Sequence, residues 1–233
     1  MPTASYSHRR GELETYFDRT AVDAWKALTS DAPVSKIRAT VRAGRDRMRS
    51  TLLSWLPEDL SGLRLLDAGC GTGALSVEAA RRGADVTAID LSENLVSYAR
   101  ELASTEKLPG SINFLSGDML DAGLGTFDHI VCMDSLIHYN SADIVRVLEQ
   151  FSARCNGSVV FTYAPRTPAL SAMHAAGKLF PKSDRAPAIQ PVSTSGLHKL
   201  IGKSGELKPW SIGRGQRIAS GFYTSHAQEL ARA

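Results

Sequence analysis

One segment of this chain limits its possible folds more than any other, because it joins a short apolar stretch, a glycine-rich turn and a helical pattern. The turn is Asp67-Ala68-Gly69-Cys70-Gly71-Thr72-Gly73. Glycine is needed where the backbone passes close to a ligand or adopts a positive φ angle. A strand, a glycine turn and a helix in this order are typical of the ligand-binding edge of an open parallel sheet. The segment therefore predicts an α/β fold with a ligand site at the turn.

The residues around the turn indicate which ligand it binds. Asp90 closes the next apolar stretch, where a carboxylate can accept hydrogen bonds from both hydroxyls of a ribose. A dinucleotide site is matched loosely by Gly69, Gly71 and Ala74. Asp67 argues against it, because a carboxylate is unfavourable beside a pyrophosphate. It suits a cationic ligand, such as the amino group and sulfonium of S-adenosylmethionine.

The string from Asp67 to Gly73 resembles motif I of the class I methyltransferases. The resemblance implies S-adenosylmethionine as the cofactor, with S-adenosylhomocysteine as its product. It implies that Asp118 accepts a hydrogen bond from the adenine amino group, that Met119 packs on the ring, and that Leu91 covers the opposite face. The full expected set of cofactor-binding residues is Asp67, Gly69, Cys70, Gly71, Gly73, Asp90, Leu91, Asp118, Met119, Met133 and Asp134.

Composition sets limits on the class of protein. Apolar residues make up 43% of the 233 residues and charged residues 22%, which is ordinary for a soluble globular chain. No run of eighteen apolar residues exists, and the first ten residues lack the hydrophobic core of a secretory signal. Three widely spaced cysteines favour reduced thiols in a cytoplasmic protein, without a metal site.

Positive charge is concentrated in one segment. Lys36 to Arg49 carries six basic residues and a single acid, Asp46. A solvated helix face accounts for this pattern, and so does an anchor for an anionic partner such as a substrate carboxylate or a lipid headgroup. Nucleic acid is not expected as a partner, because neither an aromatic stacking pattern nor a binding motif accompanies the charges.

Apolar periodicity predicts alternating strands and helices through the centre of the chain. Ser92 and Ser141 are expected as N-caps of two of the helices. This alternation predicts a Rossmann-like, doubly wound parallel sheet with helices on both faces. The expected strands are near 63–67, 85–89, 112–115, 127–132 and 158–163, and the helices are near 73–82, 92–105 and 141–153.

The two ends of the chain complete the predicted plan. Residues 1–55 are interpreted as a helical arm, with Pro33 where a helix could start and Pro57 where it should end. Residues 56–233 are expected to form the methyltransferase domain. Its insertion at about 165–192, with a short helix over 168–181, is predicted to form a lid together with the arm. A helix at about 194–203 and an antiparallel hairpin over 207–226 follow, giving a seven-stranded sheet with one antiparallel strand.

A finer resemblance lies in the arm and in the segments after the fourth and fifth strands. These segments resemble the magnesium-protoporphyrin IX methyltransferases, although the arm departs from their pattern at Asp18 and at Ala21-Val22. The segments are Tyr16–Trp25, Val34–Arg38, Val41–Arg45, Asp134–Tyr139, Thr162–Pro168, Gly177–Pro181 and Gly221–Ser225.

This second resemblance implies methyl transfer to one propionate carboxylate of magnesium protoporphyrin IX, on the route to chlorophylls and bacteriochlorophylls. Tyr16 and His138 are implied to hold that carboxylate by hydrogen bonds. Arg42, Arg45 or Arg166 could hold a propionate by a bidentate contact, and the sequence does not choose among them. The resemblance also implies a contact with a magnesium chelatase subunit. Weak peripheral association with a photosynthetic membrane is expected from the apolar cleft that a porphyrin needs.

Three other functions remain open at this stage. The first is an S-adenosylmethionine-dependent O-methyltransferase acting on a small acid, a phenol or a quinone precursor, since it would share every cofactor residue. The second is a nicotinamide-dependent oxidoreductase using the dinucleotide-like glycines. The third is a binding module that keeps the nucleotide pocket without catalysis.

Overall fold

The computed structural model describes residues 3–20, 35–167 and 188–232. Within these residues one seven-stranded sheet has the order β3-β2-β1-β4-β5-β7-β6. β7 pairs antiparallel with both β5 and β6, while the other pairs are parallel. The predicted sheet with one antiparallel strand is therefore confirmed. The strands are β1 (Arg64–Ala68), β2 (Asp85–Asp90), β3 (Ser111–Ser116), β4 (Phe127–Cys132), β5 (Cys155–Tyr163), β6 (Trp210–Ser220) and β7 (Tyr223–Arg232).

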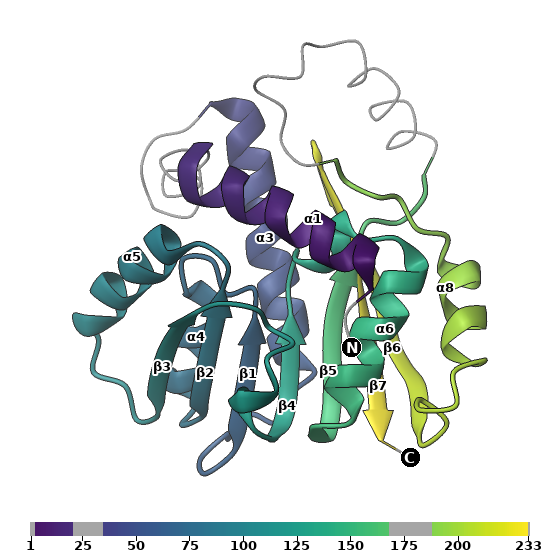
Figure 1. The fold of residues 1–233 in the computed structure, drawn as a ribbon. Coiled ribbons are helices and arrows are strands. Elements are labelled where there is room, and N and C mark those ends of the chain that lie inside the picture. The colour runs from purple at the N-terminus through teal and green to yellow at the C-terminus, as the bar shows by residue number, and fades with distance from the viewer. Residues whose placement is uncertain (1–2, 21–34, 168–187, 233) are drawn as a thin grey trace.

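Helices cover both faces of this sheet, and α1 crosses the carboxyl ends of the parallel strands (Figure 1). Residues of α3, α4 and α5 pack on one face, and residues of α1, α6 and α8 pack on the other. The helices are α1 (Ala4–Thr15), the π-helix η1 (Tyr16–Thr20), α3 (Lys36–Ser54), α4 (Ala74–Arg81), α5 (Glu93–Ser104), α6 (Ser141–Ser152) and α8 (Thr194–Ile201), with short 3-10 turns η2 (Ala122–Leu124) and η3 (Leu136–His138).

The double layer follows from alternation along the buried strands. Successive side chains of a strand point to opposite faces, so a strand that is covered on both sides has mostly apolar side chains on each of them. In β1, Leu65 packs in the core beneath α3 and α4, and Leu66 packs in the core beneath α6. In β4, Val131 packs in the same core as Leu65, and Ile130 packs in the same core as Leu66.

Helix ends follow the side chains that can cap them. Ser92 caps α5 by accepting from the Leu95 amide, as predicted. The prediction of Ser141 as a cap is wrong by one residue. The Asn140 side chain accepts from the amides of Ala142 and Asp143, because its longer amide reaches two donors at once.

The N-terminal helices differ in detail from the sequence prediction. α3 begins at Lys36, where Ser35 accepts from the Arg38 amide, and it ends at Ser54, ahead of Pro57. Pro33 lies outside the described residues. α3 packs against β7 closely enough that a Cβ at Gly44 would lie 2.5 Å from the Tyr223 ring.

The terminal hairpin is longer than the predicted 207–226. β7 continues to Arg232, because Gln228 and Glu229 are buried polar residues with internal partners. His198 Nε2 lies 2.8 Å from Gln228 Oε1, and the Arg214 guanidinium donates to the Glu229 carboxylate. Their polarity conceals the strand in the sequence.

The ends of the expected insertion are fixed to one another. Pro165 and Val192 form an isolated parallel bridge, and the Arg166 amide donates to the Val192 carbonyl oxygen. The predicted helix over 168–181 lies outside the described residues. In the part of the chain that is described, no helix is both long and apolar enough to cross a bilayer.

Candidate active site

The glycine turn connects β1 to α4 as the sequence predicts. Gly69, Gly71 and Gly73 have φ angles of 84°, 54° and 77°, a region that favours glycine. A Cβ at Gly69 would overlap the Ser135 hydroxyl, so the backbone there needs glycine for space as well. The amides of Gly69 and Cys70 donate to the Ile89 carbonyl oxygen, which ties the turn to the end of β2.

Asp90 at the end of β2 completes this connection. Its two carboxylate oxygens accept from the amides of Gly71 and Ser92, at 2.9 and 3.0 Å. Burial raises the pKa of Asp90, and these hydrogen bonds oppose the rise. The side chain lines the central cavity, so it can also face a ligand.

Asp67 lies behind the turn. It is 1% exposed, does not line the cavity, and accepts from the Ser76 hydroxyl at 2.6 Å. Burial raises the pKa of Asp67 to about 7, and the nearby charge of Asp90 adds to the rise while Ser76 opposes it. A carboxyl group poised near neutrality is sensitive to any cation that binds above the turn.

A cavity of about 400 Å³ opens above the carboxyl ends of β1, β2 and β4. This is within the usual range for small-molecule sites. Its wall is mostly apolar, and the charged residues in it are Arg38, Arg45, Asp90 and Asp134. The residues that line it are Tyr6, Leu13, Tyr16, Phe17, Arg38, Val41, Arg45, Gly69, Cys70, Gly71, Ile89, Asp90, Leu91, Leu95, Gly117, Met119, Met133, Asp134, Ser135, Ile137, His138, Tyr139 and Ile189.

Three rings from η1 and η3 form one side of this cavity. Phe17 makes edge-to-face contacts with Tyr16, at 5.1 Å between ring centroids, and with His138, at 6.1 Å. His138 is 6% exposed, and its Nδ1 lies 3.4 Å from the Ala188 carbonyl oxygen. Burial raises the pKa of the Tyr16 hydroxyl, so that it remains a hydrogen-bond donor at neutral pH. The three side chains therefore bring two polar groups to one apolar wall.

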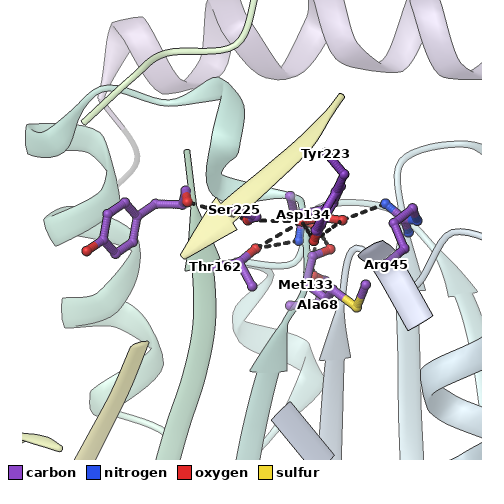
Figure 2. A network of polar contacts seen from close by, with 9 residues as sticks. Arg45, Ala68, Met133, Asp134, Thr162, Tyr223 and Ser225 are labelled. Atoms are coloured by element: carbon purple, nitrogen blue, oxygen red, sulfur yellow. Dashed lines mark hydrogen bonds and ion pairs between the residues drawn. The ribbon is translucent and has the colours of Figure 1, made fainter. Parts of the chain in front are cut away.

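Asp134, two residues beyond β4, collects donors from three elements (Figure 2). Its carboxylate accepts from Arg45 of α3 at 2.6 Å, from Thr162 of β5 at 3.3 Å, and from Tyr223 and Ser225 of β7 at 3.0 and 3.3 Å. The Asp134 side chain is 5% exposed and that of Arg45 is 18% exposed. Asp134 also has a φ angle of 56°, which a non-glycine residue adopts only when its surroundings hold it there.

Helix α1 is fixed to the segment that follows β3 and contributes Tyr6 and Leu13 to the cavity wall. The Tyr6 hydroxyl donates to one oxygen of Asp118 at 2.8 Å, and Arg10 donates to the other at 2.7 Å. The Tyr6 ring stacks on Tyr139 with centroids 5.0 Å apart. Burial raises the pKa of Tyr6, and the charge of Asp118 raises it further. Asp118 is thus a partner of the N-terminal helix.

Comparison with known proteins shows the family to which this chain belongs. Residues 132–232 match the model for the magnesium-protoporphyrin IX methyltransferase C-terminus, and residues 65–156 match a methyltransferase domain. The chain is 48% identical to the magnesium-protoporphyrin O-methyltransferase of Rhodobacter capsulatus, over 98% of this chain and 99% of that one. The chain belongs to the magnesium-protoporphyrin O-methyltransferase family.

Two further relatives give the range of similarity. The magnesium protoporphyrin IX methyltransferase of Synechocystis PCC 6803, solved with bound SAH, superposes with a TM-score of 0.83 at 27% identity, over 96% of this chain and all of that one. A ubiquinone biosynthesis O-methyltransferase of Xanthomonas oryzae is 32% identical, but over only 69% of this chain and 67% of its own length. The chain is a methyltransferase that uses S-adenosylmethionine, so the nicotinamide hypothesis is wrong.

The structure brings most of the predicted cofactor residues to one cavity. Three of them do not line the cavity: Asp67 lies behind the turn, Gly73 is the N-cap of α4, and Asp118 is bonded to α1. Their contacts with a cofactor stay predictions, as do those of the residues that do line it. The predicted residues that line the cavity are Gly69, Cys70, Gly71, Asp90, Leu91, Met119, Met133 and Asp134.

The structure also bears on which arginine could hold a substrate propionate. Arg45 lines the cavity but is paired with Asp134. Arg166 is exposed and Arg42 does not line the cavity. Arg38, which the sequence prediction did not single out, lines the cavity one helical turn before Val41.

Sequence reasoning also missed Tyr6 and Phe17. Tyr6 lies in a segment of low apolar periodicity, so no helical signal marked it as buried. Phe17 directly follows Tyr16, and the π-helical turn directs both side chains into the cavity. A π-helical turn is often found at functional sites, although no local sequence pattern specifies one.

Replacing Asp134 by Asn should destabilise the protein by about 2–4 kcal/mol, because it breaks the largely buried ion pair between Asp134 and Arg45. Asn also tolerates a positive φ, so the backbone conformation is retained. Urea unfolding measures the change.

Asp46→Asn is the matched control on α3. It removes an equal charge from a half-exposed pair with Arg49, and it should change stability by less than about 0.5 kcal/mol. Equal effects of Asp134→Asn and Asp46→Asn would contradict the importance given to the Asp134 contacts.

Proposed function

We propose that this chain transfers a methyl group from S-adenosylmethionine to one propionate carboxylate of magnesium protoporphyrin IX, in chlorophyll and bacteriochlorophyll biosynthesis. The observation that carries this proposal is the 48% identity with the Rhodobacter capsulatus enzyme over 98% of this chain. That identity extends over the arm and the hairpin as well as the cofactor turn. The ubiquinone-pathway relative covers only 69% of this chain, so the quinone-precursor alternative has weaker support.

The residues at the turn suit an adenosyl compound. The glycines leave space for a ligand to approach the backbone, and Asp90 faces the cavity where ribose hydroxyls would be held. Leu91 and Met119 provide apolar walls for the adenine ring. Asp67 acts on the cationic end through its field, because it is buried behind the turn.

When bound, S-adenosylmethionine supplies an electrophilic methyl group on a positively charged sulfur. A propionate carboxylate is ionised near neutral pH, since such groups titrate near pH ~4. No base is needed to create the nucleophile. The protein must hold one carboxylate oxygen within roughly 3–3.5 Å of the methyl carbon, in line with the bond that breaks.

The acceptor wall is suited to this task. Tyr16 and His138 would orient the carboxylate by hydrogen bonds, and Phe17 contacts both rings and fixes their separation. The surrounding Leu13, Met133 and Ile137 side chains remove water from the carboxylate. Two opposite charges become two neutral groups in the reaction, so an apolar wall favours the products over the reactants.

We assign the regions outside the sheet to substrate binding. Residues 1–55 form the arm, whose α1, η1 and α3 line the cavity, and residues 56–233 form the methyltransferase domain. The insertion over about 165–192 contributes Ile189 to the cavity wall. We assign this insertion to a lid over the substrate, and the bridge between Pro165 and Val192 joins its two ends.

Incubation with labelled S-adenosylmethionine and magnesium protoporphyrin IX should add one methyl group to the porphyrin, detected by mass. Tyr16→Phe and His138→Ala should each lower kcat about a hundredfold, because each removes one donor to the reacting carboxylate. Affinity for S-adenosylhomocysteine should stay within about threefold, as neither change touches the turn.

Tyr98→Phe and His8→Ala are the matched controls, because neither residue lines the cavity. Both should keep the wild-type rate. Transfer to a quinone precursor in place of the porphyrin would contradict the proposed substrate. Unaltered rates for Tyr16→Phe and His138→Ala would contradict the assigned roles.

Cofactor affinity should depend on the ionisation of Asp67. Burial raises its pKa to about 7, so the group is mainly neutral below that pH and mainly charged above it. A cationic ligand prefers the charged form, so affinity for S-adenosylmethionine should rise about tenfold from about pH 6 to pH 8 relative to Asp67→Asn. Calorimetric titration of both proteins measures the difference. Parallel pH profiles would exclude the effect, and Asp85→Asn is the control for loss of a distant carboxylate.

We also propose a cytoplasmic location with weak attachment to the photosynthetic membrane, and a contact with magnesium chelatase that delivers the apolar substrate. Exposed Ile37 and Phe222 support the membrane contact, because Gly221 lies against Thr40 of α3 and that helix is rich in basic residues. The chelatase contact rests on the family resemblance. Sedimentation with anionic vesicles should remove the protein from solution, and gel filtration with purified chelatase should shift the protein to an earlier elution volume. Protein that stays in the supernatant would contradict the membrane contact, and an unshifted elution volume would contradict the chelatase contact.

A further inference from the structure

Helix α3 presents one face to the cavity through Arg38, Val41 and Arg45. Residues spaced three and four apart share a helix face, so these three side chains form a row. An α-helix rises 1.5 Å per residue, which places the two arginines about 10 Å apart along the axis. An apolar residue thus lies between two cations, all directed at the same space.

The two arginines differ in electrostatic state. Arg45 is 2.6 Å from the Asp134 carboxylate, and that pair is largely buried and neutral overall. Arg38 is exposed at the cavity, and the ion pairs found among the described residues do not include it. The nearest acid of the same helix, Asp46, is bonded to Arg49. Arg38 is therefore a cation of the cavity wall whose charge no described acid offsets.

The acidic residues of the cavity wall, Asp90 and Asp134, form hydrogen bonds with groups other than Arg38. Asp90 accepts from the amides of Gly71 and Ser92 at the turn, and Asp134 accepts from Arg45. The cavity wall thus has an acid, Asp90, at the turn, and a cation without a described acid partner, Arg38, on α3. A ligand that carries both a cation and an anion would match both groups.

The proposed substrate carries two propionates, and only one receives a methyl group. The other keeps its charge and loses water where the ring meets the apolar wall, which is unfavourable unless a partner replaces the water. A cavity of about 400 Å³ is on the order of one ligand in size, so a porphyrin beside the cofactor must extend to the mouth. Among the residues that line the cavity, Arg38 and Ile189 are the exposed ones, so they are available to such a ligand.

We propose that Arg38 binds the propionate that is not methylated, and thereby selects the free diacid over its monomethyl ester. This inference rests on the proposed function and adds to it a specificity-determining residue. A guanidinium can hold a carboxylate through two parallel, charge-assisted hydrogen bonds. An ester carries no negative charge and therefore cannot form this pair. Once one propionate is esterified, the porphyrin cannot present its second carboxylate to the methyl group and still have a carboxylate at Arg38. The reaction therefore stops at one methyl group.

The test compares Arg38→Gln with Lys36→Gln, a control that removes one charge from an exposed residue of the same helix outside the cavity. Each protein is assayed with magnesium protoporphyrin IX and with an analogue whose non-reacting propionate is a carboxamide. Arg38→Gln should raise KM for the diacid about tenfold with kcat within about twofold. It should leave KM for the carboxamide analogue unchanged and should form some dimethyl ester. Arg38→Lys should show an intermediate KM, because it keeps the charge and loses the two-pronged geometry.

Several results would overturn the inference. Equal KM values for Arg38→Gln and Lys36→Gln would do so. An equal rise in KM for the diacid and for the carboxamide analogue in Arg38→Gln would also do so, because it would indicate a role in the helix or in contact with the porphyrin ring. Retained affinity for S-adenosylhomocysteine verifies that each variant is folded. Failure of the wild-type protein to methylate the porphyrin would remove the proposed function itself, whereas normal wild-type activity with an unaltered Arg38→Gln variant removes only this inference.

Discussion

The carboxylate of Asp134 holds together the elements that form the cavity. It follows β4 and accepts hydrogen bonds from α3, β5 and β7, so one buried anion links a helix to two strands of the sheet at the carboxyl end of β4. Its positive φ angle turns the chain from β4 toward η3, where His138 lies. A change at Asp134 therefore alters the position of α3 and the cavity wall together. The sheet supplies the frame, and this contact determines which helix faces the ligand.

Charge is distributed along the cavity in a way that suits the chemistry. Asp67 and Asp90 lie at the glycine turn, and burial raises the pKa of both, so a cation bound there relieves the repulsion between them. Arg38 of α3 also lines the cavity, and the ion pairs of the described residues do not include it. The wall is otherwise mostly apolar, which favours a reaction that converts an anion and a cation into neutral products. In the proposed reaction the same side chains would both orient the ligands and promote the transfer.

The sheet and its turn could be predicted from the sequence because they rest on local patterns: buried strands, glycines with positive φ angles and a capping Ser92. Partners distant in the chain could not be predicted. Asp134 was predicted as a residue near the cofactor, yet Arg45 and Tyr223, its partners, are each 89 residues away. Asp118 was expected to meet adenine, and its bonds to α1 depend on a helix whose weak periodicity hid Tyr6.

The central claim is that one cavity holds the cofactor at the glycine turn and a porphyrin carboxylate at the η1–η3 wall. A crystal structure of the protein with S-adenosylhomocysteine and magnesium protoporphyrin IX tests it most directly. The account predicts a propionate bonded to Tyr16 and His138, with an oxygen facing the cofactor sulfur and the second propionate at Arg38. A porphyrin bound away from these three residues, or a cofactor placed outside the turn, would contradict it.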